Sequence, residues 1–157
     1  MAIQSGSKIL FRSAVTADLE SLVKMLADDS LGATRENPSL PLDENYVRQF
    51  EKISNDPNNE LIVAVDEGDV VGMLQLTIIP YLTHIGTSRA LIEGVRVKAS
   101  ARGRGVGQQL VDEAINRARR RSCGIVQLTS DKARPDAIRF YEKSGFVCSH
   151  EGMKLKL

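Results

Sequence analysis

Hydrophobic and polar residues recur along this chain with two periods, and the changes between the two periods mark the expected elements. Alternation with period two, or a short apolar run, predicts strands; these lie at 8–15, in a hairpin over 61–79, at 90–97 and at 124–130. Apolar residues at helical spacing predict helices; these run from about Thr16 to 29, over 42–53, over 105–122 and over 133–145. One or two further strands are expected in 146–157.

The order of these elements is β-α-α-β-β-β-α-β-α-β(-β), which predicts an α/β fold with a mixed sheet and helices on its faces. The hairpin is predicted to turn at Glu67-Gly68-Asp69, where glycine permits a tight connection. No repeat or linker interrupts the chain, so residues 1–157 are expected to form a single domain.

Composition excludes several classes of protein. The 157 residues are 42% hydrophobic and 26% charged, and the net charge of +1 gives no strong attraction to nucleic acid or to a membrane. The chain contains no apolar run near the roughly 20 residues that cross a bilayer, and its start lacks the pattern of a secretory signal. A cytoplasmic location is therefore expected. Cys123 and Cys148 are too few for a disulfide or zinc framework, and no metal is expected.

The stretch VRVKASARGRGVGQQL (95–110) places three glycines between a predicted strand and a helix. Such a loop is suited to an anion, because unpaired amides and the helix dipole point at it. Arg102 and Arg104 add charge that suits phosphate. A Walker A loop is excluded because no Gly-Lys-Ser/Thr follows, and a dinucleotide fingerprint is excluded because Gln108 stands where a third glycine is needed. A glycine-rich turn with solvated arginines is the remaining alternative.

Two motifs carry a resemblance to a known family. Residues 102–107 read Arg-x-x-Gly-x-Gly, and DAIRFYEKSGF (136–146) matches Ala-x-x-Phe-Tyr-x-Lys-x-Gly-Phe. Together they resemble the GNAT (general N-acetyltransferase) superfamily over nearly the whole chain. The resemblance implies a mixed, mostly antiparallel sheet of six to seven strands with helices on both faces. It also implies a parallel pair, 90–97 and 124–130, that splays apart to bind acetyl-coenzyme A (acetyl-CoA).

The resemblance further implies the residues that hold CoA. The pantetheine arm is expected along Val95–Val97 and the pyrophosphate on the amides of 103–108. The family often has Asn before the second motif, and here Asp131 is the nearest polar counterpart. The expected cofactor-binding residues are Val95, Arg96, Val97, Arg102, Gly103, Arg104, Gly105, Val106, Gly107, Gln108, Asp131, Ala137 and Phe140.

Two residues are candidate catalytic groups. Tyr141 can act as the general acid that protonates the departing thiolate, or it can be a core tyrosine beside Phe140. Glu93 can act as the general base. Strand alternation places it with Leu91, Val95 and Val97, and such apolar neighbours would raise its pKa. Its alternative role is an ion pair with Arg89 or Arg96. Gly94 predicts either a bulge or a backbone amide that stabilises the oxyanion.

The acceptor is expected to be a primary amine of a small molecule or a protein. His84 and Arg35 are candidate acceptor-binding residues, although a loop histidine is often only solvated. Cys123 is given no catalytic role. C-terminal strands of such folds often pair between subunits, so a homodimer is one option. Two other functions stay open: a CoA-binding protein without activity, and a nucleic-acid-binding module based on the arginines at 117–121, which the net charge and the 4% aromatic content disfavour.

Overall fold

The computed structural model describes residues 8–157, which form one five-stranded sheet in the order β1-β2-β3-β4-β5. Neighbouring strands are antiparallel except for β4 and β5, which are parallel. The strands are β1 (Leu10–Ser13), β2 (Asn59–Asp66), β3 (Asp69–Ile79), β4 (Arg89–Val97) and β5 (Ile125–Leu128). The helices are α1 (Leu19–Ala27), α2 (Glu44–Asn55), α3 (Thr83–Gly86), α4 (Val106–Arg120) and α5 (Pro135–Lys143). The predicted α/β class and order of elements are confirmed up to α5.

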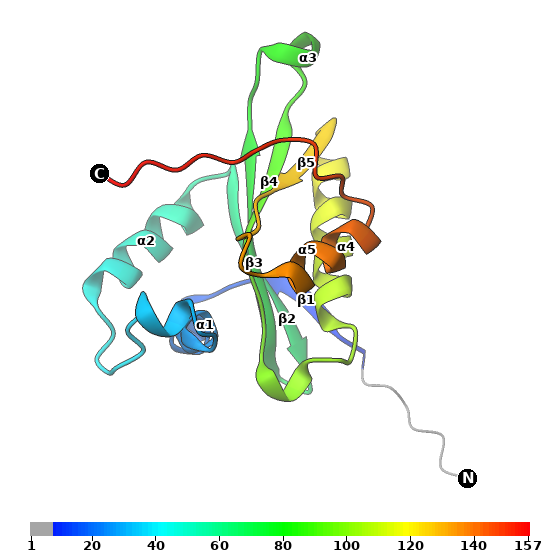
Figure 1. Ribbon diagram of the computed structural model, residues 1–157. Helices are drawn as coiled ribbons and strands as arrows, with labels where there is room; N and C mark the ends of the chain where they lie inside the picture. The colour runs from blue at the N-terminus through cyan, green and yellow to red at the C-terminus, as the bar shows by residue number, and fades with distance from the viewer. Residues whose placement is uncertain (1–7) are drawn as a thin grey trace.

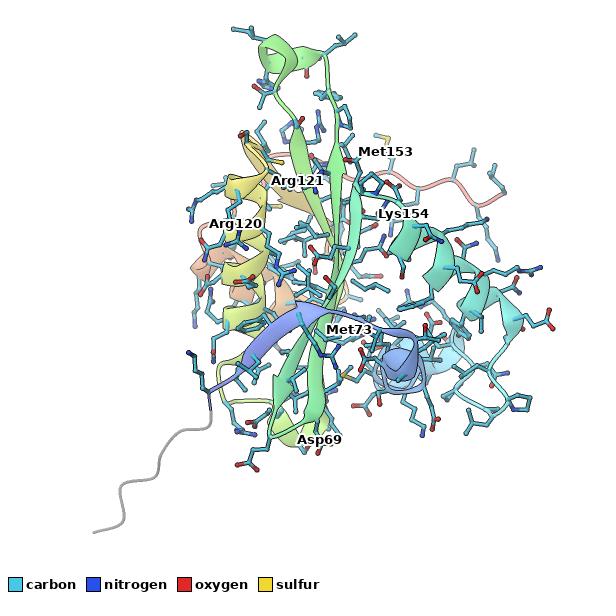
Figure 2. All side chains as sticks on the ribbon, turned by 180° about the vertical axis from the view of Figure 1, so that it is seen from behind. Asp69, Met73, Arg120, Arg121, Met153 and Lys154 are labelled. Carbon is cyan, nitrogen blue, oxygen red and sulfur yellow. The ribbon has the colours of Figure 1, made fainter. Side chains whose placement is uncertain are left out.

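The turn between β2 and β3 is the predicted tight hairpin. Asp66 pairs with Asp69, so only Glu67 and Gly68 connect the strands, with φ of 49° and 93°. Positive φ at both positions gives the backbone twist that suits a two-residue hairpin, and glycine adopts it at little cost. Figure 2 shows Asp69 at this end of the sheet.

Helices cover the two faces of the sheet (Figure 1). On one face, α1 and α2 pack on β2 and β3 through a cluster that includes Leu22, Phe50 and Met73. On the other face, α4 buries Leu110 and its apolar neighbours against β3 and β4. Gly72 of β3 permits this approach, because a Cβ there would lie 2.7 Å from Leu110 Cδ1 and 3.2 Å from the Arg96 carbonyl oxygen.

The strands expected in 146–157 do not form. The sheet therefore has five strands, and the prediction of six to seven strands is wrong. Alternation of apolar and polar residues favours a strand only where a partner covers the apolar side. The tail passes close to the end of β5, where a Cβ on Gly152 would lie 3.7 Å from Thr129. Even so, Met153, Leu155 and Leu157 stay almost fully exposed.

The connection between β3 and β4 is a long hairpin that projects from the sheet and ends in α3 (Figure 1). His84 and Ile85 have φ of 53° and 59°, so this segment is a left-handed turn rather than a regular helix. Among residues 8–157, no helix has the length and apolar character needed to span a membrane.

Candidate functional site

The parallel strands β4 and β5 separate part of the way along β4. Their pairing runs from Arg89 and Ile125 to Ile92 and Leu128, while β4 continues to Val97. Residues 93–97 therefore present a strand edge outside the β4–β5 ladder. An extended ligand with amide groups can pair with such an edge as an added strand would. The splayed pair that the resemblance implied is confirmed.

A β-bulge interrupts β4 at the point of separation. Gln75 of β3 pairs with Glu93 and Met73 pairs with Arg96, so the one residue between them on β3 faces two on β4. Gly94 carries the bulge with φ of 61°. The predicted bulge is confirmed.

The bulge also corrects the face assigned to Glu93. After the extra residue, Val95 and Val97 pack against the core beneath α4, whereas Arg96 pairs with Met73, which belongs to the core beneath α1 and α2. Glu93 therefore does not share the side of Val95 and Val97, as strict alternation required. It is exposed, and among the described residues it forms no ion pair.

The glycine loop follows β4 and begins α4. Gly103 and Gly105 have φ of 74° and 78°, and a Cβ on Gly103 would meet no atom within 4 Å. Gly105 is the N-cap of α4, so the first amides of a 15-residue helix face the loop without intrahelical partners. Val106 is buried in the core and can offer a ligand only its backbone. The main-chain groups of the loop are thus suited to an anion.

The two loop arginines are tied to carboxylates of other elements. Arg102 donates to the Asp28 carboxylate at 2.9 Å and to the Val97 carbonyl oxygen at 3.0 Å. Arg104 donates to Asp66 at 2.8 Å. Their first role is therefore to fix the loop between α1 and the β2–β3 hairpin, and the anion site relies mainly on the amides.

Helix α5 packs beside the start of α4. A Cβ on Gly107 would lie 3.5 Å from Val97 and 3.7 Å from the Phe140 ring, so the small residue lets these groups meet closely. The Ser144 hydroxyl donates to Gln108 at 2.9 Å. These contacts bring two predicted cofactor residues of α4, Gly107 and Gln108, against α5.

Asp131 and Ala137 belong to the turn that begins α5. The Asp131 carboxylate accepts from the amide of Ala133 at 2.9 Å, and its carbonyl oxygen accepts from the amide of Arg134. Asp131 therefore shapes the turn, and its predicted contact with CoA stays a prediction. Ala137 lies in the first turn of α5, on the same face as Phe140 and Tyr141.

Tyr141 lies in an aromatic group with Phe140 and Phe146, at ring-centroid distances of 5.0 and 5.9 Å. Burial raises the pKa of Tyr141, and the nearby charges of Arg134 and Arg96 oppose that increase. The phenol is therefore protonated at neutral pH and can donate a proton. Both the packing role and the acid role fit this position.

Charged side chains gather beside Tyr141. The Asp29 carboxylate, at the end of α1, lies 3.5 Å from Arg96 Nε and 3.7 Å from Arg134 Nη2. Burial lowers the pKa of Arg96; the charge of Asp29 opposes this shift, and those of Arg134 and Arg35 add to it. The charge of Arg35, a predicted acceptor-binding residue, thus acts on Arg96. Asp29 and Arg134 belong to no sequence motif, because only the fold brings them together with Arg96.

The other predicted acceptor residue, His84, lies at the tip of the β3–β4 hairpin, away from α5 (Figure 1). An open cavity of about 450 Å³ lies between α2 and the sheet, and it is lined by Gln49, Lys52, Ile53, Asp56, Asn59 and Gln75. Gln75 is the cross-strand neighbour of Glu93, so the two side chains share one face. The role of His84 stays a prediction.

The arginines near the end of α4 have partners within the chain. Arg117 pairs with Glu60 and Glu113, and Arg121 donates to Pro57 and Asn58. Arg120 and Arg121 lie on the α4 side of the sheet, opposite Met73 and α1 (Figure 2). This run therefore anchors α4, which weakens the case for nucleic-acid binding. Among residues 8–157, no group of three or more His, Cys, Asp or Glu is arranged to hold a metal.

A splayed parallel pair, a bulge and an amide-rich loop together define an α/β domain whose backbone is suited to an extended, phosphorylated ligand. The sequence model of the acetyltransferase (GNAT) family matches residues 22–146. The chain therefore belongs to the GNAT family of acetyltransferases.

Individual relatives agree with this assignment of family. A crystal structure described as a transcriptional regulator from Bacillus halodurans C-125 is 55% identical, covers 96% of this chain and 100% of that one, and has a TM-score of 0.93. The aminoalkylphosphonate N-acetyltransferase of Salmonella typhimurium is 35% identical over 60% of this chain and 61% of its own length. The glucosamine 6-phosphate N-acetyltransferase of Trypanosoma brucei brucei is 37% identical over 57% and 59%. The match spans about three fifths of the length of these curated relatives.

Proposed function

We propose that the chain transfers the acetyl group of acetyl-CoA to a primary amine of a small molecule, by direct attack within a ternary complex. The observation that carries the proposal is the separation of β4 from β5 directly before the glycine loop. This arrangement aligns a free strand edge with an anion site at a helix N-terminus, which suits a pantetheine arm followed by a pyrophosphate.

The main chain of Val95–Val97 would bind the pantetheine amides, and the amides from Gly103 to Gln108 would bind the pyrophosphate. Ala137 and Phe140 would line the arm from the α5 side. Acetyl-CoA supplies the thioester. The amide of Gly94 or Val95, aimed by the bulge, would stabilise the oxyanion that forms when the amine attacks.

Proton transfers complete the reaction. Tyr141 would give its proton to the departing thiolate, a role for which a protonated phenol near the end of the arm is suited. Glu93 would take the proton of the attacking amine, directly or through water, because it lies one residue before the bulge on the face that carries the cavity beneath α2.

The test is turnover. Release of free thiol from acetyl-CoA is followed with a panel of small amines that includes an aminoalkylphosphonate and glucosamine 6-phosphate, the acceptors in the names of two relatives. We expect acceptor-dependent release with the wild type. Binding of CoA without release for any amine would favour the alternative, a CoA-binding protein without activity. That alternative agrees with the description of one relative as a transcriptional regulator.

We also propose that two copies associate through the C-terminal tail. Met153, Leu155 and Leu157 alternate with Lys154 and Lys156, and all three apolar side chains are exposed. Pairing between copies would cover them. Light scattering after size exclusion is expected to give a dimer for the wild type and a monomer for Leu155→Glu, whereas a monomeric wild type at micromolar concentration contradicts the proposal.

A further inference from the structure

Two arginines from separate parts of the chain lie near Tyr141, and the charge of a third acts on one of them. Arg35 follows a short 3₁₀ turn after α1, Arg96 lies on β4, and Arg134 precedes α5. We call them the arginine cluster. Asp29 holds two of them, at 3.5 Å from Arg96 Nε and 3.7 Å from Arg134 Nη2. The third, Arg35, is close enough for its charge to act on Arg96.

The loop that carries Arg35 is anchored. The Tyr46 hydroxyl of α2 donates to the Glu36 carboxylate at 2.8 Å and accepts from the amide of Asn37 at 3.0 Å. These two hydrogen bonds fix the residues that follow Arg35. The backbone that carries Arg35 is therefore held in place, while its side chain is exposed.

The positive charge of the cluster is only partly compensated. Arg35, Arg96, Arg134 and Asp29 carry three positive charges and one negative charge, which leaves +2. By contrast, Arg102 and Arg104 each lie within 3 Å of a carboxylate of their own. Like charges gathered around one carboxylate repel one another, and a bound anion would relieve that repulsion.

Arg96 is the most sheltered member of the cluster. Its side chain is 12% exposed, and its Nε has no hydrogen-bond partner among the described residues. One Asp29 oxygen is occupied by the amide of Gly32 at 2.6 Å, and the other is too far from Arg96 for a hydrogen bond. A sheltered guanidinium with a free donor is suited to a ligand oxygen.

We propose that the arginine cluster binds a phosphoryl or phosphonyl group on the acceptor amine, so that the substrate is a dianionic amine. Such a group carries a charge of about −1.5 to −2 at neutral pH and three acceptor oxygens, which match a net charge of +2 and several planar donor groups. A carboxylate has one charge and two oxygens and would fill the cluster less well.

The position of the cluster favours the acceptor over the phosphates of CoA. Arg96 lies on the face of β4 that carries Met73 and α1, whereas Val95 and Val97 on either side of it face the core beneath α4. The glycine loop already offers a separate anion site. The inference rests on the proposed function, and it adds that the arginine cluster selects the acceptor amine.

The test compares matched acceptors. For the wild type, we expect kcat/KM for 2-aminoethylphosphonate to exceed that for ethylamine by about 100-fold or more, as several charge-assisted hydrogen bonds are gained. In Arg134→Gln and in Arg35→Gln this ratio should fall at least tenfold, mainly through KM for the phosphonate. Arg48→Gln removes an exposed charge of α2 and serves as the control that keeps the ratio.

Calorimetric titrations distinguish binding of the acceptor's phosphonate from binding of the CoA phosphates, and they do not require turnover. We expect the CoA-bound wild type to bind 2-aminoethylphosphonate, Arg134→Gln to bind it at least tenfold more weakly, and the Kd for CoA to differ by less than threefold between the two proteins. An equal loss of CoA affinity would assign the cluster to CoA and overturn the inference. Equal kcat/KM for the two amines would also overturn it, while the proposed function would stand. If CoA does not bind, the proposed function fails, and phosphonate binding to the free protein still decides the inference.

Discussion

Replacing Gly105 by glutamate should weaken CoA binding about 100-fold without unfolding the protein. Gly105 has φ of 78° at the N-cap of α4, where an L side chain is strained by about 1–2 kcal/mol. Gly86, at the tip of the β3–β4 hairpin, has φ of 72° and open space around it. Gly86→Glu is therefore a matched control with similar backbone strain and the same added charge, placed away from the glycine loop.

The expected loss of affinity follows from the amides at the start of α4. A hydrogen bond to a charged group contributes about 1.5–3 kcal/mol, and a carboxylate about 5 Å from a phosphate adds nearly 1 kcal/mol of repulsion even in water. Losing one such bond and adding the repulsion gives about 3 kcal/mol, which is about 100-fold in Kd.

Isothermal titration with CoA measures the change in Kd. Thermal melts without ligand measure the loss of stability that backbone strain causes in both variants. We expect both variants to lose similar stability and only Gly105→Glu to lose affinity. If Gly105→Glu binds CoA within threefold of the wild type, the glycine loop is not the pyrophosphate site. If Gly86→Glu loses as much affinity, backbone strain alone explains the effect, and a pyrophosphate site in the glycine loop is equally refuted.

Three further predictions concern single positions. Tyr141→Phe should lower kcat by about 100-fold while the Kd for CoA stays nearly constant; an unchanged kcat in steady-state assays would leave Tyr141 only a packing role. Gly72→Ala should lower the free energy of unfolding by about 1–3 kcal/mol in urea titrations, because its Cβ meets atoms at 2.7 and 3.2 Å, whereas Gly107→Ala, with contacts at 3.5 and 3.7 Å, should cost less than about 1 kcal/mol; equal losses would contradict the packing argument. Asp18→Asn should cost about 1–2 kcal/mol at pH 7, because Asp18 is buried, its pKa is lowered by the hydrogen bonds from Arg12, and Arg12 is itself two-fifths exposed. Because the folded-state pKa of Asp18 is lowered, its carboxylate contributes its full stabilisation above the unfolded value of about 3.9 and loses it as the pH falls through the folded value. The stabilities of the two proteins should therefore begin to converge as the pH falls below about 4, and a pH-independent difference would exclude this cause.

The sequence predicted those parts of the molecule that depend on local pattern. The periods of hydrophobic residues located the elements up to α5, glycine marked the Glu67-Gly68 turn, and Gly103 and Gly105 marked a loop with left-handed backbone at the start of α4. Each of these features needs only a few consecutive residues.

The errors arose where distant parts of the chain decide the outcome. The bulge at Gly94 moved Glu93 away from the face of Val95, because one inserted residue reverses the alternation that follows it. Arg96, Asp29 and Arg134 meet only after β4, α1 and the start of α5 have packed. The tail had the alternation of a strand but lacks a covering partner.

The most direct test of the central claim is the mass of the acceptor after incubation with acetyl-CoA and the wild-type protein. We predict that 2-aminoethylphosphonate gains one acetyl group, with an equal amount of free thiol released. At acetyl-CoA concentrations below its Kd, Gly105→Glu should form both products about 100-fold more slowly, while Gly86→Glu should match the wild type. Thiol released without an acetylated amine, or no product from any amine at saturating acetyl-CoA, would contradict the claim that this fold acetylates small-molecule amines.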